Sequence, residues 1–327
     1  QKRAGTLGLK LESDEQTFGG TPGAKGVSLN LTGAELVNQT IFAAPTEPLE
    51  PSIGRTVDGI LGYDLFNSYV VEIDYLARRL NLYQPQDYRY QGPGEIIPIT
   101  VEDNTPFMRA RLTQPAANSA VGKFLIDTGA NGAINVFAPF DNAHKFSNSL
   151  TKALQSTGVG FTSKSQTRTG RIERLQLGRL MMKNVVATFP RTAQGESSED
   201  EAGDGEIGGE LLRRFKVIID SSRARIILEP NARFAEPFQG SLTGVSIAAE
   251  GPDFKTFKAR SVFDNSPAAE AGLRAGDIIT AINGQPAARL TAEQLRQMFR
   301  REGRNYNLNI RRGDKSLRVS LKTRRLI

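Results

Sequence analysis

The sequence contains an internal repeat, and this repeat constrains the fold more than any other feature of the chain. Residues 62–74 read GYDLFNSYVVEID and residues 208–220 read GGELLRRFKVIID, with Gly, Leu, Val, Ile and Asp at equivalent positions. An aromatic residue, Tyr69 or Phe215, also stands at the same place in each copy. Each copy is typical of a glycine turn, a short helix, a strand, a turn and a final strand. The duplication therefore predicts two related, mainly β units.

The similarity extends upstream of these segments. Residues 27–33 and 38–41 resemble residues 172–178 and 184–187. Both pairs read as alternating strands on either side of a turn. This pattern is typical of an antiparallel hairpin, so we expect one hairpin in each unit.

Residues 124–130, FLIDTGA, place an aspartate at the end of a predicted buried strand. A small hydroxylated residue and a glycine follow Asp127, and they let the backbone fold closely around the carboxylate. This is the layout of an aspartic-protease loop, in which two carboxylates share one proton and activate a water molecule. One such triplet is also compatible with an aspartate that only caps a turn after a strand.

The pattern as a whole resembles the bacterial retropepsin-like aspartyl proteases. An apolar-apolar-Gly segment closes the domain behind the catalytic loop in that family, and residues 60–62, ILG, match it. Residues 206–208, EIG, match it except for the glutamate. The resemblance implies catalytic roles for Asp127, Thr128 and Gly129. The aspartate would activate water, and the threonine hydroxyl would brace the two loops.

The first copy has no Asp-Thr-Gly loop, and its equivalent would lie before residue 1. Residues 1–10 look like the end of the helix that follows such a loop. We therefore expect residues 1–92 to form a truncated retropepsin-like domain, and residues 93–234 to form the domain that carries Asp127. With the second catalytic aspartate upstream of the chain, this chain alone is predicted to be inactive as a monomer.

The residue inventory excludes several kinds of chemistry. The chain of 327 residues has no Cys, which excludes disulfides, thiol nucleophiles and Cys-zinc sites. Its one histidine, His144, excludes a multi-His metal site. A Ser-His-Asp triad around His144 is an open alternative, but a surface side chain is favoured. We expect neither a metal nor a cofactor, and no run of residues approaches the length of a membrane span.

Two polar segments of the second unit have more than one interpretation. Residues 157–170 are a candidate flap over the substrate, and an ordinary surface hairpin explains them equally well. Residues 196–206 are acidic and could offer oxygen ligands to calcium. They lack the ordered spacing of a calcium loop, so a solvated connection is favoured.

The C-terminal region has a different composition. From residue 255 to the end there are sixteen Lys and Arg against six Asp and Glu, whereas the whole chain carries a net charge of only +7. Ser266 and Pro267 predict a helix start, and Asn283-Gly284 predicts a tight turn between strands. Residues 291–299 predict an amphipathic helix. No nucleic-acid motif accompanies the basic residues, so nucleic acid is not an expected partner.

This region resembles a PDZ domain of the kind attached to bacterial proteases, and we assign it residues 240–327. PDZ domains bind extended peptides by strand addition beside a helix. The resemblance implies a carboxylate-binding loop and a side-chain pocket formed by Gly244, Val245, Ser246, Ile247, Leu295 and Phe299. The open alternative is that the apolar members of this set only fill the domain core.

The predicted fold class is mainly β, with two tandem retropepsin-like acid-protease β-barrel domains and a C-terminal α+β PDZ domain. The predicted function is an aspartic-type endopeptidase whose PDZ domain recruits protein substrates. The alternative is a non-catalytic peptide-binding scaffold. Expected partners are protein or peptide substrates and C-terminal peptides, with self-association through the truncated domain. The resemblance favours a periplasmic or otherwise exported protein.

Overall fold

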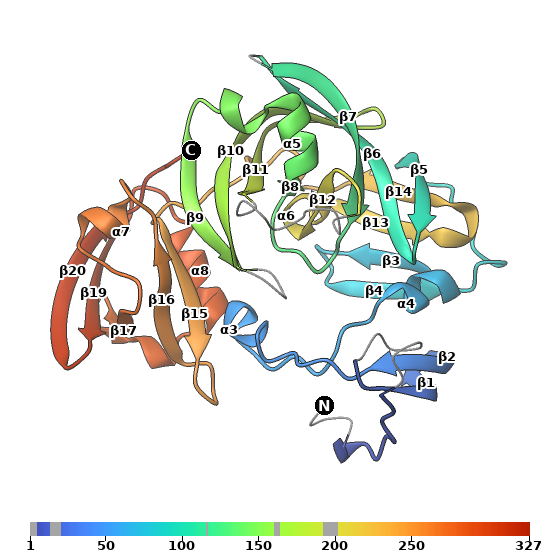
Figure 1. Cartoon of the computed structure of the whole chain (residues 1–327), viewed down its shortest axis with the longest axis horizontal. Coiled ribbons are helices and arrows are strands. Elements are labelled where there is room, and N and C mark those ends of the chain that lie inside the picture. The colour runs from blue at the N-terminus through green and yellow to red at the C-terminus, as the bar shows by residue number, and fades with distance from the viewer. Residues whose placement is uncertain (1–4, 14–20, 116, 160–163, 192–201) are drawn as a thin grey trace.

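The computed structural model describes residues 5–13, 21–115, 117–159, 164–191 and 202–327, and its described part is mainly β. The strands form a two-stranded, a twelve-stranded and a six-stranded sheet (Figure 1). Among the described residues, no helix has the length and apolar character needed to span a bilayer. The six-stranded sheet belongs to the C-terminal domain, which has a hydrophobic core of its own.

Part of the twelve-stranded sheet closes into a barrel. Its strands, in spatial order, are β6 (Thr105–Gln114), β7 (Ala117–Ile126), β12 (Gly205–Ile207), β8 (Ile134–Val136), β11 (Leu180–Arg191) and β10 (Lys164–Leu177). A second pairing, between β10 and β6, closes the circle. The interior is filled by fully buried side chains such as Leu112, Phe124 and Phe189. Because the barrel is closed, few of these strands have an edge with unpaired backbone groups.

The two repeat copies build the remaining strands of this sheet. In the first copy, α4 (Tyr63–Ser68) precedes β3 (Val70–Asp74) and β4 (Arg79–Tyr83). In the second, α6 (Gly209–Leu212) precedes β13 (Phe215–Asp220) and β14 (Arg225–Pro230). The predicted order of helix, strand, turn and strand is confirmed in both copies. Strand β3 pairs with β13, and β5 (Glu95–Glu102) joins β14 to the barrel.

The first unit does not form the barrel that the sequence predicts. Strands β1 (Gly23–Leu31) and β2 (Ala34–Phe42) form the expected hairpin, but this hairpin is a separate two-stranded sheet. The apolar pair Ile60 and Leu61 is 69% and 47% exposed. In the second copy Ile207 takes the place of Leu61. It is fully buried, because β12 lies beside β7. Within the described residues, no strand of the first unit pairs with residues 60–62.

The barrel carries a small helical segment and an outer hairpin. Helix α5 (Ala138–His144) and the turn η1 (Ser147–Ser149) follow β8, and α5 packs against β7 and β11. Strand β9 (Ala153–Val159) pairs with β10 to form the hairpin in which the candidate flap was predicted. Residues 160–163 of the candidate flap lie outside the described residues, as do residues 196–201 of the predicted acidic connection.

The C-terminal domain has a curved sheet with one main helix. Its elements are β15 (Val245–Glu250), β16 (Thr256–Val262), α7 (Pro267–Glu270), β17 (Ile278–Ile282), β18 (Gln285–Pro286), η4 (Ala287–Arg289), α8 (Ala292–Phe299), β19 (Asn305–Arg312) and β20 (Lys315–Lys322). Local sequence signals explain its boundaries. The Ser266 hydroxyl accepts the Ala269 N–H at the start of α7. Thr291 and Gln294 form a capping box at the start of α8.

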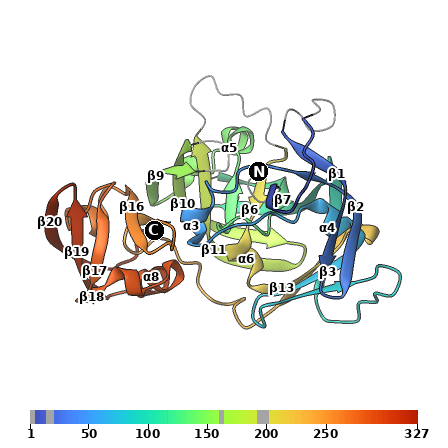
Figure 2. The ribbon, with the colours of Figure 1, turned by 90° about the horizontal axis from the view of Figure 1, so that it is seen from below.

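A buried arginine fixes the connection between the barrel and this domain. Arg214 is fully buried and donates hydrogen bonds to the carbonyl oxygens of Arg233, Glu236 and Pro237. Its guanidinium also lies 3.6 Å from the centre of the Phe238 ring. Because five donors diverge from one rigid plane, a single arginine orders the whole connection. Figure 2 shows the C-terminal domain to one side of the barrel, joined by this segment.

Candidate functional site

The structure places Asp127 directly after β7, as predicted. Its backbone N–H donates to the Ile207 carbonyl oxygen at 3.0 Å, which extends the parallel pairing of β7 with β12. The Asp127 Oδ1 accepts the N–H groups of Gly129 and Ala130 at 2.7 and 3.1 Å. The side chain therefore closes an Asx-type turn around itself.

Glycines let a second segment cross this loop closely. Gly209 N–H donates to the Ala130 carbonyl oxygen at 2.7 Å. A Cβ added to Gly208 would lie 2.5 Å from the Gly132 carbonyl oxygen, so only glycine fits there. The described residues give the Thr128 hydroxyl no hydrogen bond, and its role in bracing two loops stays a prediction from the sequence.

Tyr75 lies where the Asp127 carboxylate affects its pKa, and sequence reasoning missed it. Burial raises the pKa of Tyr75 to about 12, and the negative charge of Asp127 adds to the shift. Tyr75 follows β3 of the first repeat, so the electrostatic effect of Asp127 reaches from the second unit to the first. Within the described residues no second carboxylate shares a hydrogen bond with Asp127, and no group of three or more metal-ligating side chains exists.

His144 lies among aromatic rings. Its ring centre is 4.5 Å from that of Phe140 and 6.0 Å from that of Phe146. In the described part of the chain it has no hydrogen bond to a serine or an aspartate. The structure therefore gives no geometric support to a Ser-His-Asp triad around this residue.

A groove runs between β15 and α8 in the C-terminal domain. It contains a cavity of about 310 Å³, lined by residues that include Val245, Ile247, Leu295 and Phe299. Leu295 and Phe299 are also nearly fully buried in the domain core. These side chains therefore fill the core and form the apolar floor of the groove.

The predicted carboxylate-binding loop stands at one end of this groove. Gly244 has a φ of +74°, and an added Cβ would lie 2.1 Å from the Cβ of Ser266. Its N–H donates to the Ser241 hydroxyl at 2.9 Å. The Val245 N–H donates over 3.4 Å to the hydroxyl of Thr243, a long and weak bond. Two backbone N–H groups of this turn thus donate to hydroxyls of residues that line the groove cavity.

Two arginines on the α8 side of the groove were not identified from the sequence. Arg296 and Arg300 both line the cavity, and they stand one turn apart at the end of α8. Within the described residues, the Arg300 side chain has no hydrogen bond or ion pair. Their positions next to Leu295 and Phe299 are visible in the sequence. The direction in which they point depends on how α8 packs.

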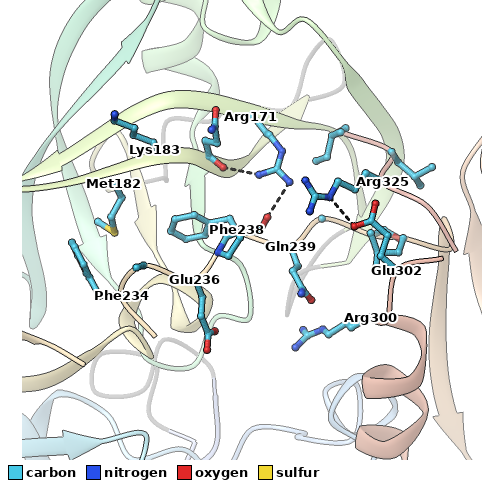
Figure 3. A pocket seen from close by; sticks show the side chains of 18 of the residues that line it. Arg171, Met182, Lys183, Phe234, Glu236, Phe238, Gln239, Arg300, Glu302 and Arg325 are labelled. Atoms are coloured by element: carbon cyan, nitrogen blue, oxygen red, sulfur yellow. Dashed lines mark hydrogen bonds and ion pairs between the residues drawn. The ribbon is translucent and has the colours of Figure 1, made fainter. Parts of the chain in front are cut away.

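A larger cavity of about 680 Å³ lies between the barrel and the C-terminal domain. Figure 3 shows Arg171 and Arg325 on adjacent sides of it, with Arg325 paired to Glu302 at 2.9 Å. Burial and the positive charge of Arg325 lower the pKa of Arg171. Arg300 lines both cavities.

Comparison with known proteins identifies the C-terminal domain. A family model of the PDZ domain matches residues 259–312. A curated relative is the periplasmic serine endoprotease DegP of Salmonella typhimurium (strain LT2), 33% identical over 107 residues. The match covers 33% of this chain and 22% of DegP, so the chain spans about a fifth of this relative's length.

Solved structures give weaker likenesses. The HtrA3 PDZ domain bound to the phage-derived ligand FGRWV is 24% identical, with 26% of this chain and 86% of that chain covered and a TM-score of 0.23. A serine endoprotease from Yersinia pestis is 12% identical, with 83% and 100% covered and a TM-score of 0.26. Such scores are too low to assign an overall fold.

The chain therefore contains a PDZ domain, as predicted. The predicted aspartic-type endopeptidase is wrong, because the curated relative is a serine endoprotease. One aspartate loop is not sufficient to define a two-carboxylate mechanism. Asp127, Thr128 and Gly129 keep a catalytic role only as a prediction from the sequence, since no comparison tests them.

Proposed function

We propose that this protein binds the carboxyl-terminal segments of other proteins in the groove between β15 and α8. Strand β15 is the edge strand of the PDZ sheet, and an incoming peptide extends a sheet at such an edge. The single observation that carries the proposal is the position of the Gly244 turn, whose backbone N–H groups donate to two hydroxyls of residues that line the apolar groove.

Each part of a peptide end has a matching group in this groove. The terminal carboxylate replaces the Ser241 and Thr243 hydroxyls as acceptor for the loop N–H groups. The last side chain enters the apolar space between Val245, Leu295 and Phe299. The peptide backbone pairs with residues that follow Ser246 and Ile247 along β15. Arg300 adds a positive charge on the side from which the carboxylate approaches.

The proposal includes the architecture of the rest of the chain. Residues 1–92 and 93–234 are proposed as two related units of a retropepsin-like topology, followed by the PDZ domain at 240–327. Pairing of the repeated strands β3 and β13 supports this arrangement. Because the curated relative is a protease, we also propose that the groove serves proteolysis by holding protein ends. No described residue is assigned to bond cleavage.

Calorimetric titration of the full chain tests the function. The probe is FGRWV, the peptide in the HtrA3 structure, with its carboxylate either free or amidated. We expect the free peptide to bind with a dissociation constant on the order of micromolar, and the amidated peptide to bind at least about tenfold more weakly. Equal binding of the two forms, or binding of neither, would overturn the proposal.

A further inference from the structure

A segment of the first repeat unit lies on the PDZ groove. Helix α3 (Glu50–Ile53) contacts β15, although the two are almost two hundred residues apart in the chain. Figure 1 shows α3 next to β15 and α8. Ser52 itself lines the groove cavity together with Val245 and Leu295. The contact therefore lies over the peptide site and not on another face of the domain.

Two arginines of the PDZ domain hold this segment. Arg296 on α8 donates hydrogen bonds to the carbonyl oxygens of Ser52 and Ile53, the last of these at 3.3 Å. These carbonyls lie at the C-terminal end of α3, where a positive charge is favoured. Arg260 on β16 donates to the Ser52 hydroxyl at 3.0 Å. Side chains from both sides of the groove thus converge on one residue of α3.

Gly54 makes the approach close enough for these bonds. It ends α3 with a φ of +83°, and its N–H donates to the Glu50 carbonyl oxygen. An added Cβ would lie 2.4 Å from the Cβ of Ala292 and 3.6 Å from the Cβ of Ala249. Ala292 begins α8 and Ala249 lies near the end of β15, so Gly54 fits between the two walls of the groove. Any side chain here would push the segment away.

We propose that α3 is an internal occupant of the PDZ groove that a bound peptide must displace. The inference rests on the proposed function. A peptide that pairs along β15 passes through the space that α3 and Gly54 cover. The remaining cavity, near Leu295 and Phe299, takes the terminal residue, and the preceding residues of the peptide compete with α3.

The short length of α3 favours its release from the groove. Helix α3 has four residues, which is too short to be stable without its contacts to the PDZ domain. When α3 is docked, only a fraction of molecules offers an open groove, and the apparent affinity for peptide falls by that fraction. Peptide binding in turn frees a segment that belongs to the first repeat unit. The groove and this unit are therefore coupled, and the coupling is reciprocal.

Gly54→Ala tests the inference in the full chain. The added methyl group clashes with Ala292 and releases α3. The matched control is Gly33→Ala, because Gly33 has a similar φ of +81° but nothing within 4 Å of an added Cβ. Arg260→Ala is a second releasing variant, and it removes a bond to Ser52 without altering a residue that lines the cavity.

Two measurements are made on each variant. The first is the rate of tryptic cleavage after Arg55, an exposed residue next to the docked segment, followed by mass spectrometry without peptide. The second is calorimetric affinity for FGRWV. We expect Gly54→Ala to speed cleavage and to tighten peptide binding by about tenfold. Arg260→Ala should change both in the same direction and less, while Gly33→Ala should match the unaltered protein.

The outcomes separate the two proposals. Cleavage after Arg55 and affinity for FGRWV that are the same in Gly54→Ala, Arg260→Ala and the unaltered protein would overturn the inference and leave the peptide-binding function intact. If FGRWV binds none of the proteins, the proposed function fails and the competition fails with it, even where cleavage after Arg55 rises. Faster cleavage together with tighter binding supports both.

Discussion

Glu72 lies directly opposite Ile218 in the β3–β13 ladder, and the two residues occupy the same position of the internal repeat. On one side of this pair Val71 faces Ile219, which is the repeat equivalent of Ile73. On the other side Ile73 faces Val217, which is the repeat equivalent of Val71. A local twofold axis therefore passes between Glu72 and Ile218. The repeat is not only a duplicated sequence, because its two copies pair with each other through a shared antiparallel ladder.

The two copies end in aspartates with very different surroundings. Asp220 is fully buried and accepts hydrogen bonds from Ser222, Arg223 and Arg225. We expect Asp220→Asn to lower the free energy of unfolding by about 3 kcal/mol, because two arginines lose their buried partner. Urea unfolding measures the loss. A change below about 1 kcal/mol would show that this cluster is not important for stability.

The equivalent Asp74 provides the matched control. In the described part of the chain, its Oδ1 accepts only the backbone N–H groups of Leu76 and Ala77, at 3.0 and 2.9 Å, in a partly exposed turn. Asp74→Asn should therefore cost only about 1 kcal/mol, the typical value of such hydrogen bonds. Equal losses at the two positions would contradict the assignment of different roles to the two copies.

Acid should remove the contribution of Asp220. Burial alone would raise the pKa of this carboxyl, but hydrogen bonds from Ser222, Arg225 and Arg223 outweigh it and hold the pKa below its usual range. A depressed folded-state pKa contributes stability above the unfolded value of about 3.9, and that stability disappears as the pH falls through the folded value. We expect the difference in unfolding free energy between the unaltered protein and Asp220→Asn to shrink below about pH 4. A difference constant from pH 7 to pH 2 would refute this.

Local sequence signals predicted the elements of this structure well. The PDZ helix begins at Pro267 after Ser266, and the turn at Asn283-Gly284 adopts the expected left-handed backbone, with φ values of 50° and 80°. Such signals act within a few residues, so one sequence is sufficient to recognise them. The repeat predicted equivalent strands for the same reason.

Contacts between distant segments were not predicted. The effect of Asp127 on the pKa of Tyr75 and the docking of α3 on Arg296 each involve residues far apart in the chain, and neither has a local pattern. The first unit was predicted to be a barrel from its similarity to the second. Closure of a barrel needs a strand beside residues 60–62, and the described part of the chain has none there. The prediction of an aspartic-type endopeptidase was also wrong, and one aspartate loop does not reveal the group that faces it.

The turn at Gly244 should be essential for peptide binding. Gly244→Ala would place a Cβ 2.1 Å from that of Ser266 in a left-handed backbone. We expect binding of FGRWV to fall by at least about tenfold, because the loop N–H groups turn away from the groove. Gly284→Ala is the control, with a φ of +80° and no atom within 4 Å of an added Cβ. Equal losses of affinity in both variants would point to backbone strain alone.

Arg300 should contribute charge to peptide recognition. Arg300→Gln is expected to weaken binding of the free peptide by about threefold to tenfold and to leave the amidated peptide almost unchanged. The salt dependence of binding should also decrease. Arg318→Gln, an exposed arginine on β20 at a position that lines neither cavity, is the control. Calorimetry at two salt concentrations decides, and the prediction fails if both peptides lose affinity equally.

The connection between the barrel and the PDZ domain should depend on the shape of Arg214. Lysine keeps the charge, but it cannot donate to the separate carbonyls of Arg233, Glu236 and Pro237 or lie flat on the Phe238 ring. We expect Arg214→Lys to lower the free energy of unfolding by about 3 kcal/mol and to speed tryptic cleavage after Arg233.

The adjacent Arg213 tests whether shape or only charge matters at this connection. Its side chain is 24% exposed and pairs with Glu210 at 2.8 Å, a contact that lysine can also make. Arg213→Lys should therefore change stability by less than about 1 kcal/mol and leave cleavage after Arg233 unchanged. Binding of FGRWV should survive in both variants, because the PDZ core is separate from the barrel core. If Arg214→Lys is as stable and as resistant to trypsin as Arg213→Lys, the buried guanidinium does not order the connection.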